Sequence, residues 1–256
     1  MRYWRLLAVV IVWALLPTTH AWSAGRPRVS ARDYFPLTKG NSWTYQGTVR
    51  EAYEEGKPVA CTVEVTRTIA DVWKLGDGAY LAPLDATVRI VGACPDAKVA
   101  DEIRHAFQPA DLLLYFVDGP KVYEVWSDVA TRRTGHKDMH AVTLAELRAY
   151  AKELVPDFVF PLRVGLRYNE GQEPVREDYF YQWVVSRGKP VRIGQQLHRE
   201  VYTLRYRSLP DEQEVDFIPG VGIAREKSVH HGPTDEWELR LVRYHLLTPP
   251  QPSPSR

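Results

Sequence analysis

The sequence predicts a mainly β protein in which antiparallel strands form one strongly curved sheet, an open or half barrel, covered by one or two helices. Two observations lead to this fold class. Apolar and polar residues alternate with period two in many short segments, which is typical of half-buried strands. Most of these segments are bounded by glycine, proline or aspartate, so the strands are expected to follow one another through turns and not through crossover helices.

The clearest strand prediction is residues 59–69, where the apolar side chains fall on one face and Cys61 is expected to point inward. Asp118-Gly119-Pro120 predicts a hairpin turn between two further strands. The complete set of predicted strands is 42–49, 59–69, 79–91, 112–117, 121–127, 179–185, 200–207, 214–218, 222–229 and 236–245.

One helix is predicted between the strands. Thr143 and Glu146 form a capping-box pattern ahead of regularly spaced apolar residues, and Pro156 marks the end of the helical segment. Residues 101–107 are a second, shorter candidate. We expect these helices to cover an open face or one end of the sheet.

Residues 22–247 are expected to form a single β-rich domain, followed by a disordered tail over 248–256 that has nothing apolar to bury. Two segments within the domain, 34–40 and 159–165, share the pattern Phe-Pro-Leu-x-x-Gly. Each would turn the chain into a new strand, because proline fixes φ and glycine allows an unusual backbone. This repeat suggests two similar sheet halves, 34–155 and 156–247.

The first 21 residues have the layout of a cleavable secretory signal peptide. Arginines lie near the start, residues 6–16 are apolar, and small residues lead to an expected cleavage after Ala21. The apolar run is shorter than the roughly 20 residues of a membrane-spanning helix. We therefore expect an exported protein, periplasmic or extracellular, without stable membrane insertion; an uncleaved anchor is the alternative.

The charge balance bears on the class of partner. The chain has 33 Lys and Arg against 32 Asp and Glu, and removal of the signal leaves it close to neutral. No basic surface of the kind that binds nucleic acid or an anionic membrane is expected.

The only two cysteines are Cys61 and Cys94, 33 positions apart. In an oxidising compartment, a lone pair at this spacing favours a disulfide over a metal or redox site, since a redox motif needs the two close together. Two separate buried thiols are the alternative.

The opening motif Tyr34-Phe35-Pro36-Leu37, followed by Gly40-Asn41, Trp43 and Tyr45, resembles the start of a group of exported bacterial β-rich proteins without assigned activity. Members of that group also tend to carry a Pro-Leu-x-x-Gly segment midway, a Pro-Gly-Val-Gly segment near the C-terminus and a closing strand. Residues 219–222 and 238–246 are similar to the last two. The resemblance implies a bacterial envelope protein and carries over no catalytic residues.

Candidate metal ligands are His136 and His140, four positions apart. On a helix this spacing would place both rings on one face, but Gly135 and the cap at Thr143 put the pair in a loop. The Glu that follows the first His in zinc-protease motifs is absent. A solvated loop is the alternative to a weak metal site, and we predict neither a cofactor nor a catalytic residue.

Aromatic side chains on predicted strands are the remaining functional signal. They could line an apolar ligand cavity or fill an ordinary sheet core. The ligand-facing candidates are Trp43, Tyr45, Trp126, Tyr179, Tyr181 and Trp183.

These signals favour a non-enzymatic exported protein that binds an apolar small molecule, a lipid or another envelope protein. The first alternative is a metal-assisted hydrolase that uses the region of His136 and His140. The second is a structural or interaction module without a pocket.

Overall fold

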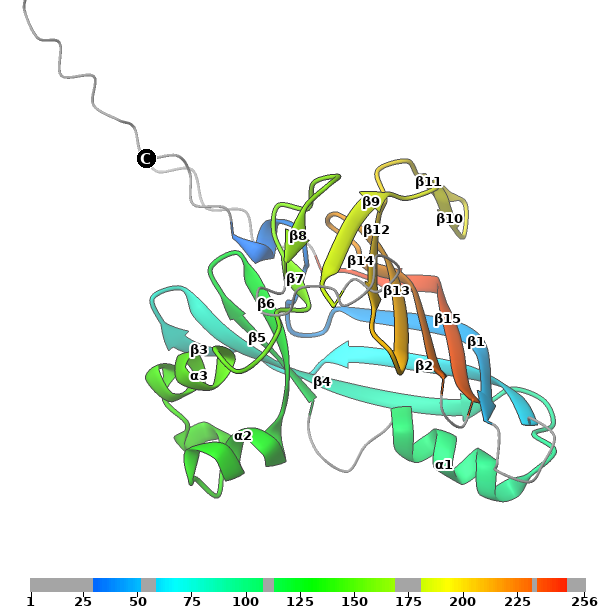
Figure 1. Ribbon diagram of the computed structural model, residues 1–256, viewed down its shortest axis with the longest axis horizontal. Helices are drawn as coiled ribbons and strands as arrows, with labels where there is room; N and C mark the ends of the chain where they lie inside the picture. Colours follow the sequence, from blue (N-terminus) through cyan, green and yellow to red (C-terminus); the bar gives the residue numbers. More distant parts are fainter. Residues whose placement is uncertain (1–29, 52–58, 108–112, 169–180, 232–233, 248–256) are drawn as a thin grey trace, which may run out of the picture.

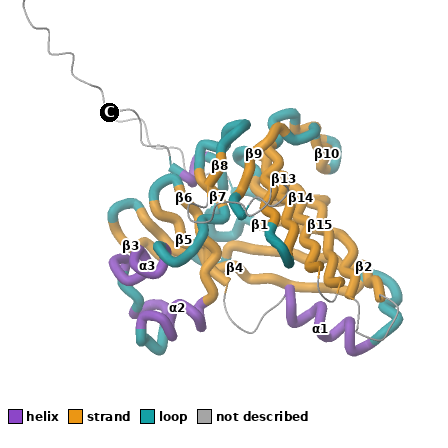
Figure 2. Tube along the Cα trace, viewed as in Figure 1, coloured by secondary structure: helices purple, strands orange, loops and turns teal. Residues whose placement is uncertain are grey.

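The computed structural model describes residues 30–51, 59–107, 113–168, 181–231 and 234–247 (Figure 1). Its main feature is a 13-stranded antiparallel sheet that curves into a barrel-like shape (Figure 2). The predicted fold class, a strongly curved antiparallel sheet with covering helices, is confirmed.

We call the strands of the N-terminal part the first wing. They are β1 (Ser42–Glu51), β2 (Val59–Ile69), β3 (Trp73–Gly76), β4 (Ala79–Ile90), β5 (Leu113–Asp118), β6 (Lys121–Trp126) and β7 (Phe158–Val159). The second wing contains the remaining strands of the sheet. They are β8 (Arg167–Tyr168), β9 (Trp183–Arg187), β12 (Tyr202–Arg207), β13 (Asp211–Ile218), β14 (Gly222–His231) and β15 (Thr234–His245). A separate two-stranded sheet consists of β10 (Val191–Ile193) and β11 (Gln196–His198).

The two wings meet where the first and last strands of the sheet pair. The strand order is β7-β6-β5-β4-β2-β1-β15-β14-β13-β12-β9-β8, and β3 pairs with β4 off this path. The seam between β1 and β15 runs from Ser42 opposite His245 to Arg50 opposite Glu236. Gly47 is required at this seam, because a Cβ there would lie 1.8 Å from the backbone oxygen of Glu238.

Most predicted strands appear close to their predicted bounds, and β2 has the same bounds as its prediction. The predicted hairpin is present, with Asp118 opposite Lys121. One strand prediction needs correction: β9 begins only at Trp183, because Tyr181 has a left-handed φ of 44° that interrupts an extended run. The short strands β3, β7, β8, β10 and β11 were not predicted.

In the described segments, three α-helices accompany the sheet: α1 (Ala97–Phe107), α2 (Ser127–Thr134) and α3 (Leu144–Ala151). The capping box of Thr143 and Glu146 is present at the start of α3, although the helix ends at Ala151, before Pro156. Helix α1 starts earlier than the predicted segment 101–107, and α2 was not predicted. None of the described helices is both long and apolar enough to cross a membrane.

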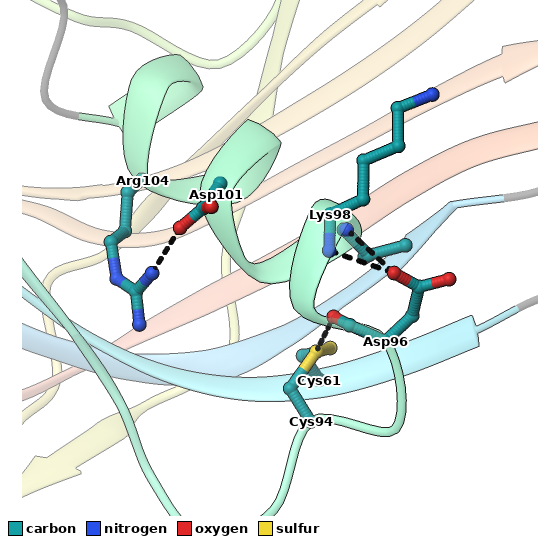
Figure 3. The surroundings of a disulfide bond; sticks show 7 residues. Cys61, Cys94, Asp96, Lys98, Asp101 and Arg104 are labelled. Carbon is teal, nitrogen blue, oxygen red and sulfur yellow. Dashed lines mark hydrogen bonds and ion pairs between the residues drawn. A yellow bond between two sulfur atoms is a disulfide. The ribbon is translucent and has the colours of Figure 1, made fainter.

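The predicted disulfide is present and lies beside the start of α1 (Figure 3). The Cα atoms of Cys61 and Cys94 are 4.9 Å apart. Asp96 follows the bridge, and its carboxylate accepts hydrogen bonds from the backbone N–H groups of Lys98 and Val99, which caps the helix. The bridge and the cap together hold α1 against the sheet, with Val99 in the core.

Buried side chains form two clusters. The larger cluster includes Phe35, Phe158 and Phe217, whose rings contact one another at centroid distances of 5.1 to 5.6 Å. The smaller cluster includes Phe116 and Leu147 and packs α3 against the first wing.

The two Phe-Pro-Leu-x-x-Gly segments contact each other in the larger cluster. Tyr34 stacks on Phe160 at 5.2 Å between ring centroids. Gly40 and Gly165 both have φ of 86°, a conformation that favours glycine and explains why each segment ends in this residue.

Candidate functional site

The strongest candidate site is a cavity of about 210 Å³ between the two wings. Strands of both wings contribute its walls, so residues far apart in the sequence meet there. The lining residues are Arg67, Leu113, Glu124, Asp157, Phe158, Trp183, Gln213, Val215, Ile223, Glu226, Lys227, Ser228 and Trp237.

Strand register explains which second-wing side chains reach the cavity. Gln213 lies opposite Ser228, and Ser228 lies opposite Trp237, so one row of lining residues crosses β13, β14 and β15. A neighbouring row places Val215 opposite Glu226. A bulge between Asp216 and Phe217 shifts the register beyond this point, so simple alternation along β14 does not identify its inward residues.

One part of the cavity wall is apolar. Trp183 and Phe158 are buried, Trp237 is half-buried, and all three belong to the lining. Phe107 at the end of α1 contacts the Trp237 ring edge to face at 5.5 Å, so α1 supports this wall from behind. An apolar wall of this kind favours a ligand with an apolar body.

The polar part of the wall contains an ion pair that joins the wings. Arg67 of β2 donates two hydrogen bonds to Glu226 of β14, from Nη1 to Oε1 at 2.5 Å and from Nη2 to Oε2 at 3.0 Å. Burial alone would lower the pKa of Arg67, but the Glu226 carboxylate more than offsets it and raises that pKa above its ordinary value. Arg67 therefore stays charged, and the paired geometry uses both carboxylate oxygens of Glu226.

Two further carboxyl groups, Glu124 and Asp157, line the same part of the cavity. The backbone N–H of Glu124 donates to Oδ2 of Asp157 at 2.6 Å, so the two residues are neighbours. Burial raises the pKa of Glu124, and the charges of Asp157 and Glu226 raise it further. Burial also raises the pKa of Asp157. Because both groups are harder to ionise than in water, the pair retains a proton more readily than two exposed carboxyls would.

Of the aromatic ligand-facing candidates that the structure describes, the cavity includes one, Trp183. Trp43 and Tyr45 are buried in the core, where the Trp43 indole donates to the Val221 carbonyl at 2.7 Å and the Tyr45 hydroxyl donates to the Ile223 carbonyl at 3.2 Å. Their hydrogen-bonding groups are thus occupied by backbone.

The other aromatic candidates lie elsewhere. Trp126 is 38% exposed at the end of β6. Tyr181 is half-buried just before β9, and its N–H donates to the Arg207 carbonyl at 2.9 Å. Tyr179 lies outside the described residues.

The two candidate metal ligands contact different groups. His136 Nε2 lies 3.0 Å from the Glu146 carboxylate, whereas the His140 ring packs on Trp73 at a centroid distance of 4.0 Å. Within the part of the chain that the structure describes, no group of three His, Cys, Asp or Glu side chains could hold a metal ion. The arrangement gives no support to metal-assisted chemistry at this loop.

Sequence reasoning missed the charged residues of the cavity, although one signal was available. Arg67 falls on the face of β2 otherwise formed by Cys61, Val63, Val65 and Ile69, so it interrupts an apolar series at an inward position. A charged residue in such a series indicates either a buried partner or a polar cavity. Glu226 had no such signal, because the extra residue Ala224 shifts the register within β14 itself.

No protein-family model matches the chain. No curated protein matches it either. Among solved structures, the chain is similar to a candidate exported protein with a YmcC-like fold from Bacteroides fragilis NCTC 9343. The TM-score is 0.37 at 11% sequence identity, over 83% of this chain and 98% of the other.

Proposed function

We propose that this protein is an exported, non-enzymatic binding protein that holds a small, largely apolar molecule in the cavity between its wings. The observation that carries the proposal is the cavity itself, whose lining combines an apolar wall of Phe158, Trp183 and Trp237 with a few charged groups, among them the buried Glu226. Such a combination is typical of small-molecule sites, in which apolar contact supplies affinity and a few polar groups fix orientation.

Export to the periplasm or the cell exterior belongs to the same proposal. It is supported by the signal-peptide pattern of residues 1–21 and by the resemblance of the Tyr34–Tyr45 region to exported bacterial proteins. The Cys61–Cys94 disulfide fits an oxidising compartment.

Binding can be tested with 2-phenylethanol, a neutral probe small enough for a cavity of about 210 Å³. A smaller apolar cavity, of roughly 150 Å³, already holds benzene in another protein. For a probe of about nine non-hydrogen atoms, we expect a dissociation constant on the order of a millimolar or tighter. Tryptophan fluorescence is a direct readout, because Trp183 and Trp237 line the cavity.

A matched pair of variants locates the probe. Val215→Phe fills the cavity, whereas Val242→Phe makes the same change at a side chain that is 37% exposed on β15. We expect Val215→Phe to weaken binding at least tenfold and Val242→Phe to leave it unchanged, with circular dichroism confirming the fold of both. A folded wild-type protein that binds no small apolar probe would overturn the proposal.

A further inference from the structure

The charge balance of the cavity says which chemical class of ligand it takes. We propose that the cavity selects a molecule with a positively charged amine attached to a small apolar body, and that Glu124 and Asp157 receive the amine. This inference rests on the proposed binding function and adds the ligand class to it.

The first step is that the cations of the cavity are already paired. Arg67 is engaged by both carboxylate oxygens of Glu226. Lys227, the other cationic lining residue, pairs with Glu236 at 3.4 Å. Neither side chain is therefore a ready partner for an incoming anion.

The second step is that Glu124 and Asp157 lack such a partner. Within the described residues, neither carboxyl has a Lys, Arg or His nitrogen at ion-pair distance. Tyr115 donates a hydrogen bond to the Glu124 carboxyl, and the Glu124 backbone donates to Asp157. The charge of Arg67 acts on Glu124 only from beyond ion-pair distance, and Arg67 is already engaged by Glu226. Neither carboxyl therefore has a cation of its own, which a bound ammonium would supply.

The third step is independent of the carboxyls and concerns the aromatic wall. Trp183, Trp237 and Phe158 line the same cavity as the acid pair. Aromatic rings attract cations through their negative faces, tryptophan most strongly, so rings and carboxylates favour the same ligand charge. An anionic ligand would instead add a negative charge beside two carboxyls that are already harder to ionise there than in water.

Three probes with one aromatic body test the ligand class: phenethylamine, 2-phenylethanol and phenylacetate, titrated by isothermal calorimetry at pH 7. We expect phenethylamine to bind at least tenfold more tightly than 2-phenylethanol, and phenylacetate to bind most weakly. Equal affinities, or tightest binding of phenylacetate, would overturn the inference while leaving the binding function intact. If none of the three binds, the proposed function itself fails.

Variants then assign the amine to its carboxyls. Glu124→Gln and Asp157→Asn should each reduce the preference for phenethylamine over 2-phenylethanol to less than threefold, while 2-phenylethanol binding reports that the cavity is still folded. Glu64→Gln is the matched control, because Glu64 lies on the outer face of β2, where it accepts hydrogen bonds from Gln46 and Arg89. Retention of the full preference in both cavity variants would refute the assignment to these carboxyls.

Discussion

The inner faces of the two wings share one core, whereas their outer faces differ in polarity. In the first wing, the outward side chains of β4 and β5 are as buried as the core: Leu81, Leu114 and Phe116 are all 0% exposed. They belong to the smaller cluster, which also contains Leu147 of α3 and Ala130 of α2. The sheet here is buried on both faces.

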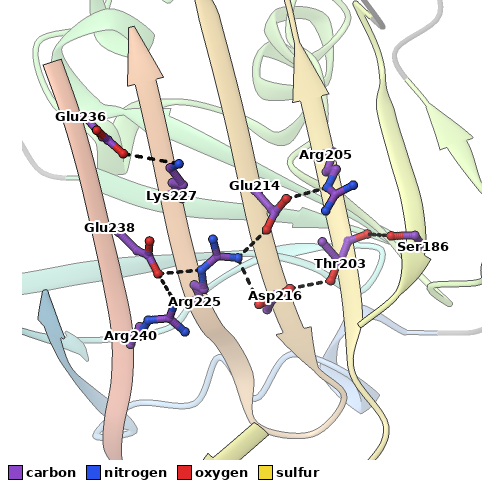
Figure 4. Close-up of polar contacts among 10 residues, drawn as sticks. All are labelled: Ser186, Thr203, Arg205, Glu214, Asp216, Arg225, Lys227, Glu236, Glu238 and Arg240. Atoms are coloured by element: carbon purple, nitrogen blue, oxygen red, sulfur yellow. Dashed lines mark hydrogen bonds and ion pairs between the residues drawn. The ribbon is translucent and has the colours of Figure 1, made fainter. Parts of the chain in front are cut away.

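In the second wing, the outer face carries charge (Figure 4). Arg225 of β14 is central: it pairs with Glu214 and Asp216 of β13 and with Glu238 of β15. Glu214 also accepts from Arg205 of β12. Charged side chains, and not packed helices, therefore lie on this outer face.

The difference indicates that the outward residues of the strands determine whether helices pack over a sheet face. Strand β5 reads Leu-Leu-Tyr-Phe-Val-Asp, an almost continuous apolar run that is typical of a strand buried on both faces. Strand β13 reads Asp-Glu-Gln-Glu-Val-Asp-Phe-Ile, with charged residues at its outward positions. The same antiparallel pairing thus supports a covered wing and an open one.

The largest expected effect comes from the covered exterior. Phe116→Ala removes a fully buried ring between β5 and the helices and should lower the free energy of unfolding by about 3 to 5 kcal/mol. Urea denaturation measures the change. Val242→Ala, at an exposed position of β15, should cost no more than about 0.5 kcal/mol. Similar losses in the two variants would show that the wings do not differ in the way described.

The next test concerns the interior contact that joins the wings. Arg67→Met leaves Glu226 buried without its partner and should destabilise the protein by about 3 to 5 kcal/mol. Adding Glu226→Leu should restore part of the loss, because the double variant has no unpaired buried charge. Denaturation of both single variants and the double variant gives the coupling energy. Strictly additive losses would contradict the interpretation of this contact as one paired unit.

Local sequence patterns predicted the elements that are determined by neighbours in the chain. The alternation in residues 59–69 predicted β2, the Asp118-Gly119-Pro120 turn predicted the β5–β6 hairpin, and Thr143 predicted the start of α3. In each case a period, a turn or a cap carries its own physical signal.

Elements that depend on distant partners were not predictable in the same way. Strands β7 and β8 are two residues long and exist only through pairing with β6 and β9. Helix α2 has one buried residue, Ala130, so it shows little amphipathic pattern. The cavity depends on residues of both wings, and the seam that joins the wings pairs strands at the two ends of the domain.

The pH dependence of stability should distinguish Glu124, in the interior, from Glu64, on the outer face. Burial first, then the charges of Asp157 and Glu226, raise the pKa of Glu124 to about 8, so its contribution to stability is fully present below its unfolded pKa of about 4.5 and lost as pH rises through 8. Glu124→Gln should therefore gain stability relative to wild type between pH 5 and pH 8, measured by urea denaturation. Arg67 and Tyr115 face the same group and are unchanged in the comparison.

Glu64→Gln, on the outer face, should show the opposite pH dependence of stability. Hydrogen bonds from Gln46 and then from Arg89 lower the pKa of Glu64, so its contribution is present above the unfolded pKa and lost as pH falls. This variant should lose stability relative to wild type at neutral pH and approach it in acid. Parallel pH profiles of Glu64→Gln and Glu124→Gln would contradict the contrast between outer face and interior.

The smallest expected effect is at the centre of the charged exterior, Arg225. Replacing it by Met should cost about 1 kcal/mol, because every carboxylate that it contacts keeps another donor. Glu214 keeps Arg205, and Glu238 keeps Arg240, so no carboxylate of these two is left without a cation.

Salt dependence distinguishes this charge effect from lost packing of the arginine stem. Urea denaturation of wild type, Arg225→Met and Arg225→Lys in about 0.05 M and 0.5 M sodium chloride should show that the loss in Arg225→Met shrinks at high salt, because the screening length falls from about 14 Å to about 4 Å. Arg225→Lys keeps the charge and should lose less at low salt, although lysine lacks the fork that contacts three carboxylates at once. A salt-independent loss as large as that of Phe116→Ala would mean that the open exterior stabilises its wing by burial, as the covered exterior does.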